Sequence, residues 1–133
     1  MLPSSTCRIP VRPGSGAMTL VCVGGFRVWA MCERMAGWGR TAGITAGGGY
    51  RGGAIVPLKH NVDEALKGKT TIKRVIVFRR AGNEVHIEEG RDVWWHRELE
   101  YVDAHCPPAA LDNEPPLSIL YPTGSPGQPK VIL

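Results

Sequence analysis

The order of apolar segments along the chain predicts an α/β protein, with a partial, largely parallel sheet and flanking helices. Two observations carry this prediction. Short apolar runs alternate with stretches in which apolar residues recur every three or four positions, as they do in helices. The run Val75–Phe78 is apolar without interruption, which is typical of a strand that is buried on both faces of a parallel sheet. The predicted order is therefore β-α-β-α-β-α-β.

Each element has its own local signal. Strands are predicted over residues 18–23, 41–46, 75–78 and 117–121, and helices over 28–37, 57–67 and 92–102. The first helix is followed by Gly37 and Gly39, which act as C-terminal stops. The second begins at Pro57, a residue that suits the first turn of a helix, and carries Val62, Ala65 and Leu66 on one face. Asp92 is predicted to cap the third helix.

Length and composition restrict the classes of function. The 133 residues make one domain's worth of chain, and 43% apolar with 21% charged residues exclude a disordered segment. The net charge of +4 suits a polyanionic ligand. No run of Lys and Arg exceeds two residues and aromatic residues make up only 7%, so nucleic-acid binding is the weaker interpretation.

The cysteines and the N-terminal segment bear on location. The four cysteines show no CxxC pair and no zinc spacing, so we expect free thiols in a reducing compartment, no metal site and a cytoplasmic protein. No apolar run has transmembrane length, and no membrane partner is expected. The first 32 residues lack Asp and Glu and contain three Arg, a composition also found in mitochondrial presequences. Pro3, Pro10 and Pro13 argue against the amphipathic helix that such a signal needs.

A glycine- and hydroxyl-rich loop follows the last predicted strand, in the sequence LYPTGSPGQPK from Leu120. Glycines let backbone N–H groups approach an anion closely, and hydroxyls and a Lys add donors and charge. The spacing excludes the GxxxxGK[ST] form of phosphate loop. The candidate ATP-phosphate ligands are Thr123, Gly124, Ser125, Gly127 and Lys130.

Three further segments carry a resemblance to a known family. They read GGYRGGAIVPLKHNVDEAL from Gly48, EGRDVWWH from Glu89 and DNEPPLSILY from Asp112. Together with the loop, which is similar to the family signature YTSGSTGKPKG, they resemble the AMP-forming acetate–CoA ligases, or acetyl-coenzyme A synthetases, of the adenylate-forming superfamily. The resemblance covers residues 16–133, a part of the large N-terminal, AMP-binding domain that ends just after the phosphate loop. Residues 1–15 are left unassigned.

The resemblance implies a reaction and a set of ligands. The family joins acetate to ATP as acetyl-adenylate and then transfers the acetyl group to CoA. Arg51, Gly52 and Gly53 match the family turn that contacts the phosphate-bearing nucleotide of CoA, and the five loop residues match the ATP-phosphate site. In the family the acetate pocket, the Mg²⁺ ligand and the catalytic Lys of the C-terminal domain all lie downstream of the loop. We therefore assign no catalytic or metal-binding residue here, and expect the chain to be inactive alone, marginally stable and prone to aggregate.

Several residues depart from the family pattern. Pro122 and Pro126 stand where hydroxyl residues are usual, Gln128 where Lys is common, and Val131 where glycine is usual. Each proline removes a backbone donor, so the loop is expected to bind phosphate weakly. Ala54 replaces a second basic residue after the RGG turn, which predicts weakened CoA binding.

Two other functions stay open at this point. Residues 47–52 fit GxGxxG, and Arg79 and Arg80 end the next strong strand, as in an NADP-binding α/β module. Against this, Pro57 delays the helix and an acidic residue about 20 positions on is missing. The other alternative is a small basic binding protein without catalysis. The group Trp94, Trp95 and His96 is assigned a structural role, because one His without further ligands is not a metal site.

Overall fold

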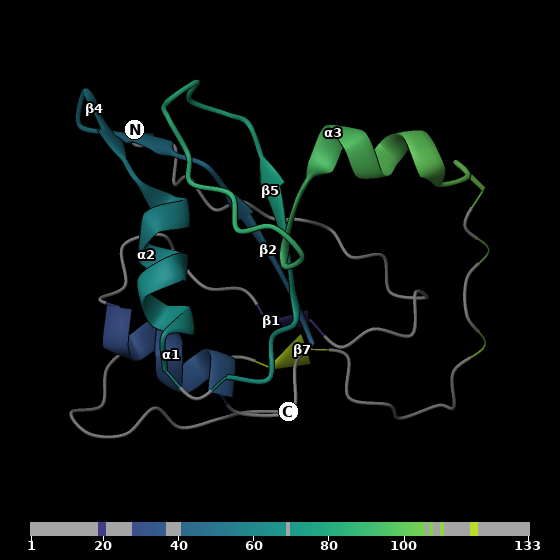
Figure 1. Cartoon of the computed structure of the whole chain (residues 1–133), viewed down its shortest axis with the longest axis horizontal. Helices are drawn as coiled ribbons and strands as arrows, with labels where there is room; N and C mark the ends of the chain where they lie inside the picture. The colour runs from purple at the N-terminus through teal and green to yellow at the C-terminus, as the bar shows by residue number, and fades with distance from the viewer. Residues whose placement is uncertain are drawn as a thin grey trace. The chain divides into compact units, whose positions relative to one another are not determined.

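The computed structural model describes residues 19–20, 28–36, 41–68, 70–105, 107, 110 and 118–119. The chain divides into two compact units, one formed by Gly24–Val102 and the other by Met1–Val23 with Asp103–Leu133. Figure 1 shows the elements of both.

A three-stranded parallel sheet forms the centre of the Gly24–Val102 unit. Its strands are β2 (Ala42–Ala46), β5 (Arg74–Phe78) and β6 (Asp92–Trp94), in the order β2-β5-β6. Ile44 lies opposite Ile76, and Ile76 lies opposite Val93. The α/β class and the parallel sheet are as predicted.

Two helices cover one face of this sheet. They are α1 (Val28–Ala36) and α2 (Leu58–Leu66), and Figure 1 shows both on the same side of β2 and β5. The buried core joins them to the central strand and consists of Met31, Val62, Ala65, Val75 and Val77. The predicted helices over 28–37 and 57–67 are thus found within one residue of their expected ends, with Pro57 directly before α2.

The predicted burial of Val75–Phe78 on both faces is not found. Val75 and Val77 are buried, whereas Ile76 is half-buried and Phe78 is 47% exposed. The helices shield one face of β5, and the described residues leave the other face partly open. An apolar run in the sequence therefore did not translate into equal burial of its two sides.

The segment from Asp92 is a strand before it is a helix, which corrects the prediction of one helix over 92–102. Asp92–Trp94 is β6, Trp95–Glu98 is a single helical turn, α3, and Leu99–Tyr101 is a 3-10 turn. Asp92 is not an N-cap, because its carboxylate enters a buried ion-pair cluster described below. Trp94, half-buried at the end of β6, has the Arg79 guanidinium 4.8 Å from its ring centre.

A second feature absent from the prediction is a hairpin between β2 and α2. Its strands are β3 (Gly49–Arg51) and β4 (Ala54–Val56), which pair antiparallel with Arg51 opposite Ala54. Gly52 and Gly53 make the turn, with φ of 56° and 79°. Positive φ at both central residues is characteristic of a type I′ turn, and glycine adopts this conformation at low steric cost.

In the other unit the structure describes one short parallel pair. Thr19–Leu20 (β1) pairs with Ser118–Ile119 (β7), within the strands predicted over 18–23 and 117–121. The phosphate loop that follows, with its five candidate ligands, lies outside the described residues. No helix among the described residues is long and apolar enough to cross a membrane.

Candidate functional site

The RGG turn is the predicted site that the structure describes. Arg51 is the last residue of β3 and its side chain is exposed. Within the described part of the chain, no hydrogen bond or ion pair holds the guanidinium. A Cβ placed on Gly52 or Gly53 would meet no atom within 4 Å, so the glycines are required by backbone conformation and not by crowding. The turn therefore presents the exposed Arg51 guanidinium at the tip of a hairpin, without a partner among the described residues, which is suitable for binding an anion.

The base of the hairpin is closed by the backbone of Gly47. Its N–H donates to the carbonyl of Phe78 at 2.9 Å, and its carbonyl accepts from the N–H of Lys59 at 3.2 Å. A Cβ at Gly47 would come within 2.6 Å of Val85, and one at Gly48 within 2.3 Å of the Asn83 amide oxygen. These two glycines allow close packing between segments of the protein.

This geometry does not support the dinucleotide-binding alternative. In that motif the glycines lead directly into a helix whose N-terminus meets the pyrophosphate. Here a complete hairpin, β3 and β4, separates the glycines from α2, which starts at Leu58. Arg79 packs against Trp94.

A cluster of charges with a buried centre lies where α2 meets β6. Its members are Lys59, Asp63, Glu88, Arg91 and Asp92. The Lys59 side chain is only 2% exposed and the Asp92 side chain is fully buried. Lys59 Nζ lies 2.7 Å from Asp92 Oδ2 and 2.6 Å from Asp63 Oδ1, and donates to the His86 carbonyl at 3.2 Å. The buried ammonium thus has three oxygen partners.

Arg91 holds the other side of the same carboxylate. Its Nε donates to Asp92 Oδ1 at 2.6 Å and its Nη2 to Oδ2 at 2.9 Å, which is a two-pronged contact. The backbone N–H of Glu88 donates to Asp92 Oδ2 at 2.9 Å. Burial raises the pKa of Asp92, but the hydrogen bonds from Arg91 and Lys59 outweigh it and lower the pKa to about 2. The hydrogen bonds that Arg91 donates to Asp92 also stabilise the charged form of Arg91, so they raise the pKa of Arg91 above its usual range.

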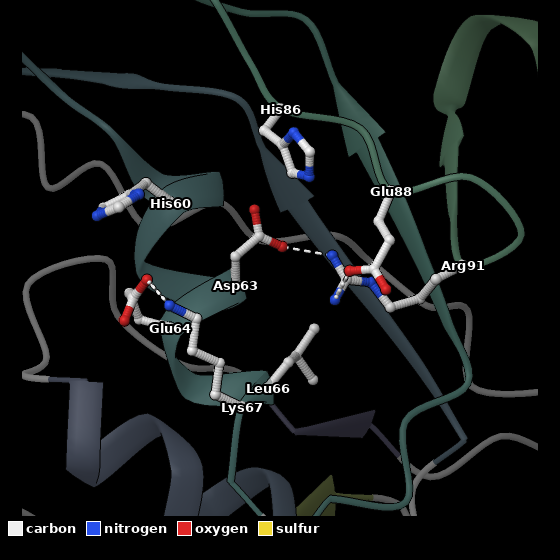
Figure 2. A pocket seen from close by; sticks show the side chains of 8 residues that line it. All are labelled: His60, Asp63, Glu64, Leu66, Lys67, His86, Glu88 and Arg91. Atoms are coloured by element: carbon white, nitrogen blue, oxygen red, sulfur yellow. Dashed lines mark hydrogen bonds and ion pairs between the residues drawn. The ribbon is translucent and has the colours of Figure 1, made fainter.

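A charged cavity of about 520 Å³ borders this cluster (Figure 2). It is lined by His60, Asp63, Glu64, Leu66, Lys67, His86, Glu88 and Arg91. Asp63 bonds Arg91, Arg91 bonds Glu88 at 2.7 Å, and Lys67 bonds Glu64 at 2.6 Å. Within the described part of the chain, no group of three or more His, Cys, Asp or Glu is placed to hold a metal ion. The three carboxylates that line the cavity, those of Asp63, Glu64 and Glu88, are each paired with a cation.

The cluster acts as a brace and was missed by the sequence reasoning. It joins the first turn of α2 to β6, and Lys59 also closes the base of the hairpin through its backbone N–H. One signal was readable, because Lys59 and Asp63 stand four residues apart on a predicted helix. Nothing in the sequence predicts that Arg91 and Asp92 meet this pair, because they come from another segment.

Comparison with known proteins decides the family resemblance. The chain is 43% identical over 135 aligned positions to acetyl-coenzyme A synthetases of Yersinia pestis (strain Pestoides F) and Yersinia pseudotuberculosis serotype O:1b (strain IP 31758). It is 40% identical to the acetyl-coenzyme A synthetase of Shewanella baltica (strain OS155 / ATCC BAA-1091). The resemblance to acetyl-coenzyme A synthetases is confirmed.

The matched region has a definite extent. The alignments cover the whole of this chain but only 21% of each acetyl-coenzyme A synthetase. The chain therefore spans about a fifth of the length of these relatives. No protein-family profile matches the chain.

Proposed function

We propose that this chain is the segment of an AMP-forming acetate–CoA ligase that meets the phosphates of CoA and of ATP. The observation that carries the proposal is the 43% identity over the whole chain to acetyl-coenzyme A synthetases. Arg51, Gly52 and Gly53 contact CoA, and the loop residues hold the ATP phosphates, namely Thr123, Gly124, Ser125, Gly127 and Lys130. The exposed guanidinium of Arg51, for which the described residues provide no hydrogen-bond or ion-pair partner, supports the first assignment.

The remaining parts of the reaction belong to the part of the relatives that this chain does not match. There we place the acetate pocket, the Mg²⁺ ligand and the catalytic residues, so that acetate, ATP and CoA are used together only in the complete enzyme. We also propose a cytoplasmic location, consistent with the free thiol of Cys32.

A titration of the chain with ATP, CoA and NADPH tests the proposal. The expected result is that ATP or CoA binds saturably and that each competes only weakly with the other. NADPH should not bind. Tight binding of NADPH alone would favour the dinucleotide-binding alternative. Binding of none of the three would favour a small basic protein with another partner.

Replacement of Arg51 by alanine is expected to weaken CoA binding about tenfold to a hundredfold, because a hydrogen bond to a charged group contributes roughly 1.5–3 kcal/mol. Dephospho-CoA, which lacks the ribose phosphate, should lose much less. Calorimetric titration of both ligands measures this difference. Arg97→Ala, which removes another exposed arginine, on α3, is the matched control and should change neither affinity. Equal losses for the two ligands would contradict the proposed contact.

The 133-residue chain by itself is expected to form no acetyl-CoA from acetate, ATP and CoA. Holding reactants together in the right orientation can lower the activation barrier by roughly 7–11 kcal/mol. This segment lacks that contribution, because alone it cannot position acetate against ATP. The triple variant Pro126→Thr, Gln128→Lys and Val131→Gly should bind ATP more tightly and still show no turnover. Acetate-dependent release of pyrophosphate above the level of a Lys130→Ala control would contradict this prediction.

A further inference from the structure

The hairpin that carries Arg51 depends on its base for its position. Among the described strands, β3 and β4 pair only with each other and not with a third strand. A two-stranded hairpin by itself is marginally stable in water, so contacts from neighbouring elements have to hold it. The direction in which these contacts hold the hairpin sets the place of the Arg51 guanidinium.

The first two residues of α2 hold both strands of the hairpin. Leu58 comes two positions after Val56, the last residue of β4, so the exit of the hairpin moves with the start of α2 (Figure 1). A Cβ placed on Gly49, the first residue of β3, would lie 3.1 Å from Leu58 Cδ1, so Leu58 packs closely on the entry strand. The backbone N–H of Lys59 donates to the carbonyl of Gly47, just before β3. Both ends of the hairpin are therefore fixed to the start of α2.

The side chain of Lys59 fixes the start of α2 in turn. Its ammonium contacts the carboxylates of Asp63 and Asp92 and the carbonyl of His86. Asp92 is the first residue of β6, and His86 belongs to the connection between β5 and β6, so two of these three contacts reach outside α2. Separating the buried ammonium from these oxygens would leave buried charges without compensation, which is costly. One residue thus joins the base of the hairpin to β6, through its backbone N–H on one side and its side chain on the other.

We propose that Lys59 is a positioning residue for the anion site at Arg51. Its buried ammonium holds the start of α2, and with it the hairpin, in the place from which the guanidinium meets the nucleotide phosphate of CoA. The inference rests on the proposed function in taking that phosphate as the ligand of Arg51. It assigns Lys59 an effect on which ligand is preferred, in addition to its effect on stability. A loss of stability alone lowers the apparent affinity for every ligand by the same factor and leaves the preference unchanged.

Two variants of the 133-residue chain separate position from stability. Lys59→Met removes the ammonium, so the carboxylates of Asp63 and Asp92 lose one cation. Lys59→Met with Asp63→Asn removes one charge of each sign and keeps the oxygen that accepts from Arg91, so part of the lost stability should return. Both variants lack the ammonium contact between α2 and β6. Lys67→Met, which removes an exposed charge at the C-cap of α2, is the matched control.

The preference for CoA over dephospho-CoA is expected to fall at least about threefold in both variants, because a displaced guanidinium loses part of a charge-assisted hydrogen bond. The loss should be similar in the two, although their stabilities differ, and Lys67→Met should keep the preference of the parent chain. Calorimetric titration of both ligands measures the preference, and urea unfolding measures the stability. A preference that does not fall, or that returns in the double variant together with stability, would overturn the proposal.

A measurement without ligand keeps this proposal separate from the proposed function. Residual dipolar couplings of backbone amides report the orientation of β3 and β4 relative to β5 in the folded molecules alone. In both variants the couplings of the hairpin should change relative to those of β5, and in Lys67→Met they should not. An unchanged orientation in both variants would overturn the positioning role. If the parent chain binds neither CoA nor dephospho-CoA, the proposed function fails, and the couplings alone decide whether Lys59 positions the hairpin.

Discussion

Replacement of Lys59 by methionine is expected to lower the free energy of unfolding by about 3 kcal/mol or more. Removing one partner of a buried ion pair leaves the other charge without compensation, which typically costs 3–5 kcal/mol. Asp92 would keep its contacts with Arg91 and with the Glu88 N–H, so the lower end of that range is expected. Urea unfolding followed by circular dichroism measures the loss.

Lys67→Met is the matched control for this change. Lys67 also pairs with a carboxylate, Glu64, at 2.6 Å, but its side chain is 71% exposed. Exposed pairs of this kind contribute about 0–1 kcal/mol. Both variants lose one positive charge, Lys59 from the first turn of α2 and Lys67 from its C-cap, and the two positions differ in burial. Similar, small losses in both would show that the buried cluster does not brace α2 against β6.

Acid is expected to destabilise the protein through Asp92. The pKa of this carboxyl is about 2 in the folded chain, against an ordinary value of 3.8. The folded state therefore binds the proton more weakly than the unfolded state, and the carboxylate stabilises the fold at pH values above its ordinary pKa. This contribution, about 2 kcal/mol, is lost as the pH falls from about 5 toward 2.

Comparison with Asp92→Asn isolates this contribution from other titrating groups. The variant has no carboxyl at this position, so its unfolding free energy should fall less steeply below pH 5 than that of the parent chain. The gap between the two proteins should shrink by about 2 kcal/mol between pH 5 and pH 2. A gap that stays constant over this range would mean that Asp92 titrates normally in the fold.

The elements that the sequence predicted are those with strong local signals. The helix after Pro57 carries Val62 and Ala65 at helical spacing, and both are buried. The run Val75–Phe78 became the central strand, because its β-branched residues suit the middle of a sheet. In these segments the local pattern and the tertiary packing favour the same structure.

The failures have physical causes too. EGRDVWWH has apolar residues that fit a helix, but Asp92–Trp94 pairs with β5, which places Asp92 beside Lys59. Neither β5 nor Lys59 is near this segment in the sequence. The hairpin strands have three residues each, too few for an alternating pattern, although Gly52-Gly53 is a recognised hairpin turn signal. Of the candidate site, the RGG turn could be predicted as a turn, whereas the pairing that fixes its base could not.

The pairing of β1 with β7 has a consequence for how the chain acquires its structure. Thr19–Leu20 and Ser118–Ile119 stand at opposite ends of the sequence, with all of the Gly24–Val102 unit between them. Closing so long a loop costs more entropy than forming neighbouring contacts, and it requires both strands to have been synthesised. On the ribosome β2, β5 and β6 would be complete long before β7 emerges. The Gly24–Val102 unit is therefore expected to fold first. The other unit is expected to form afterwards, when β7 becomes available to pair with β1.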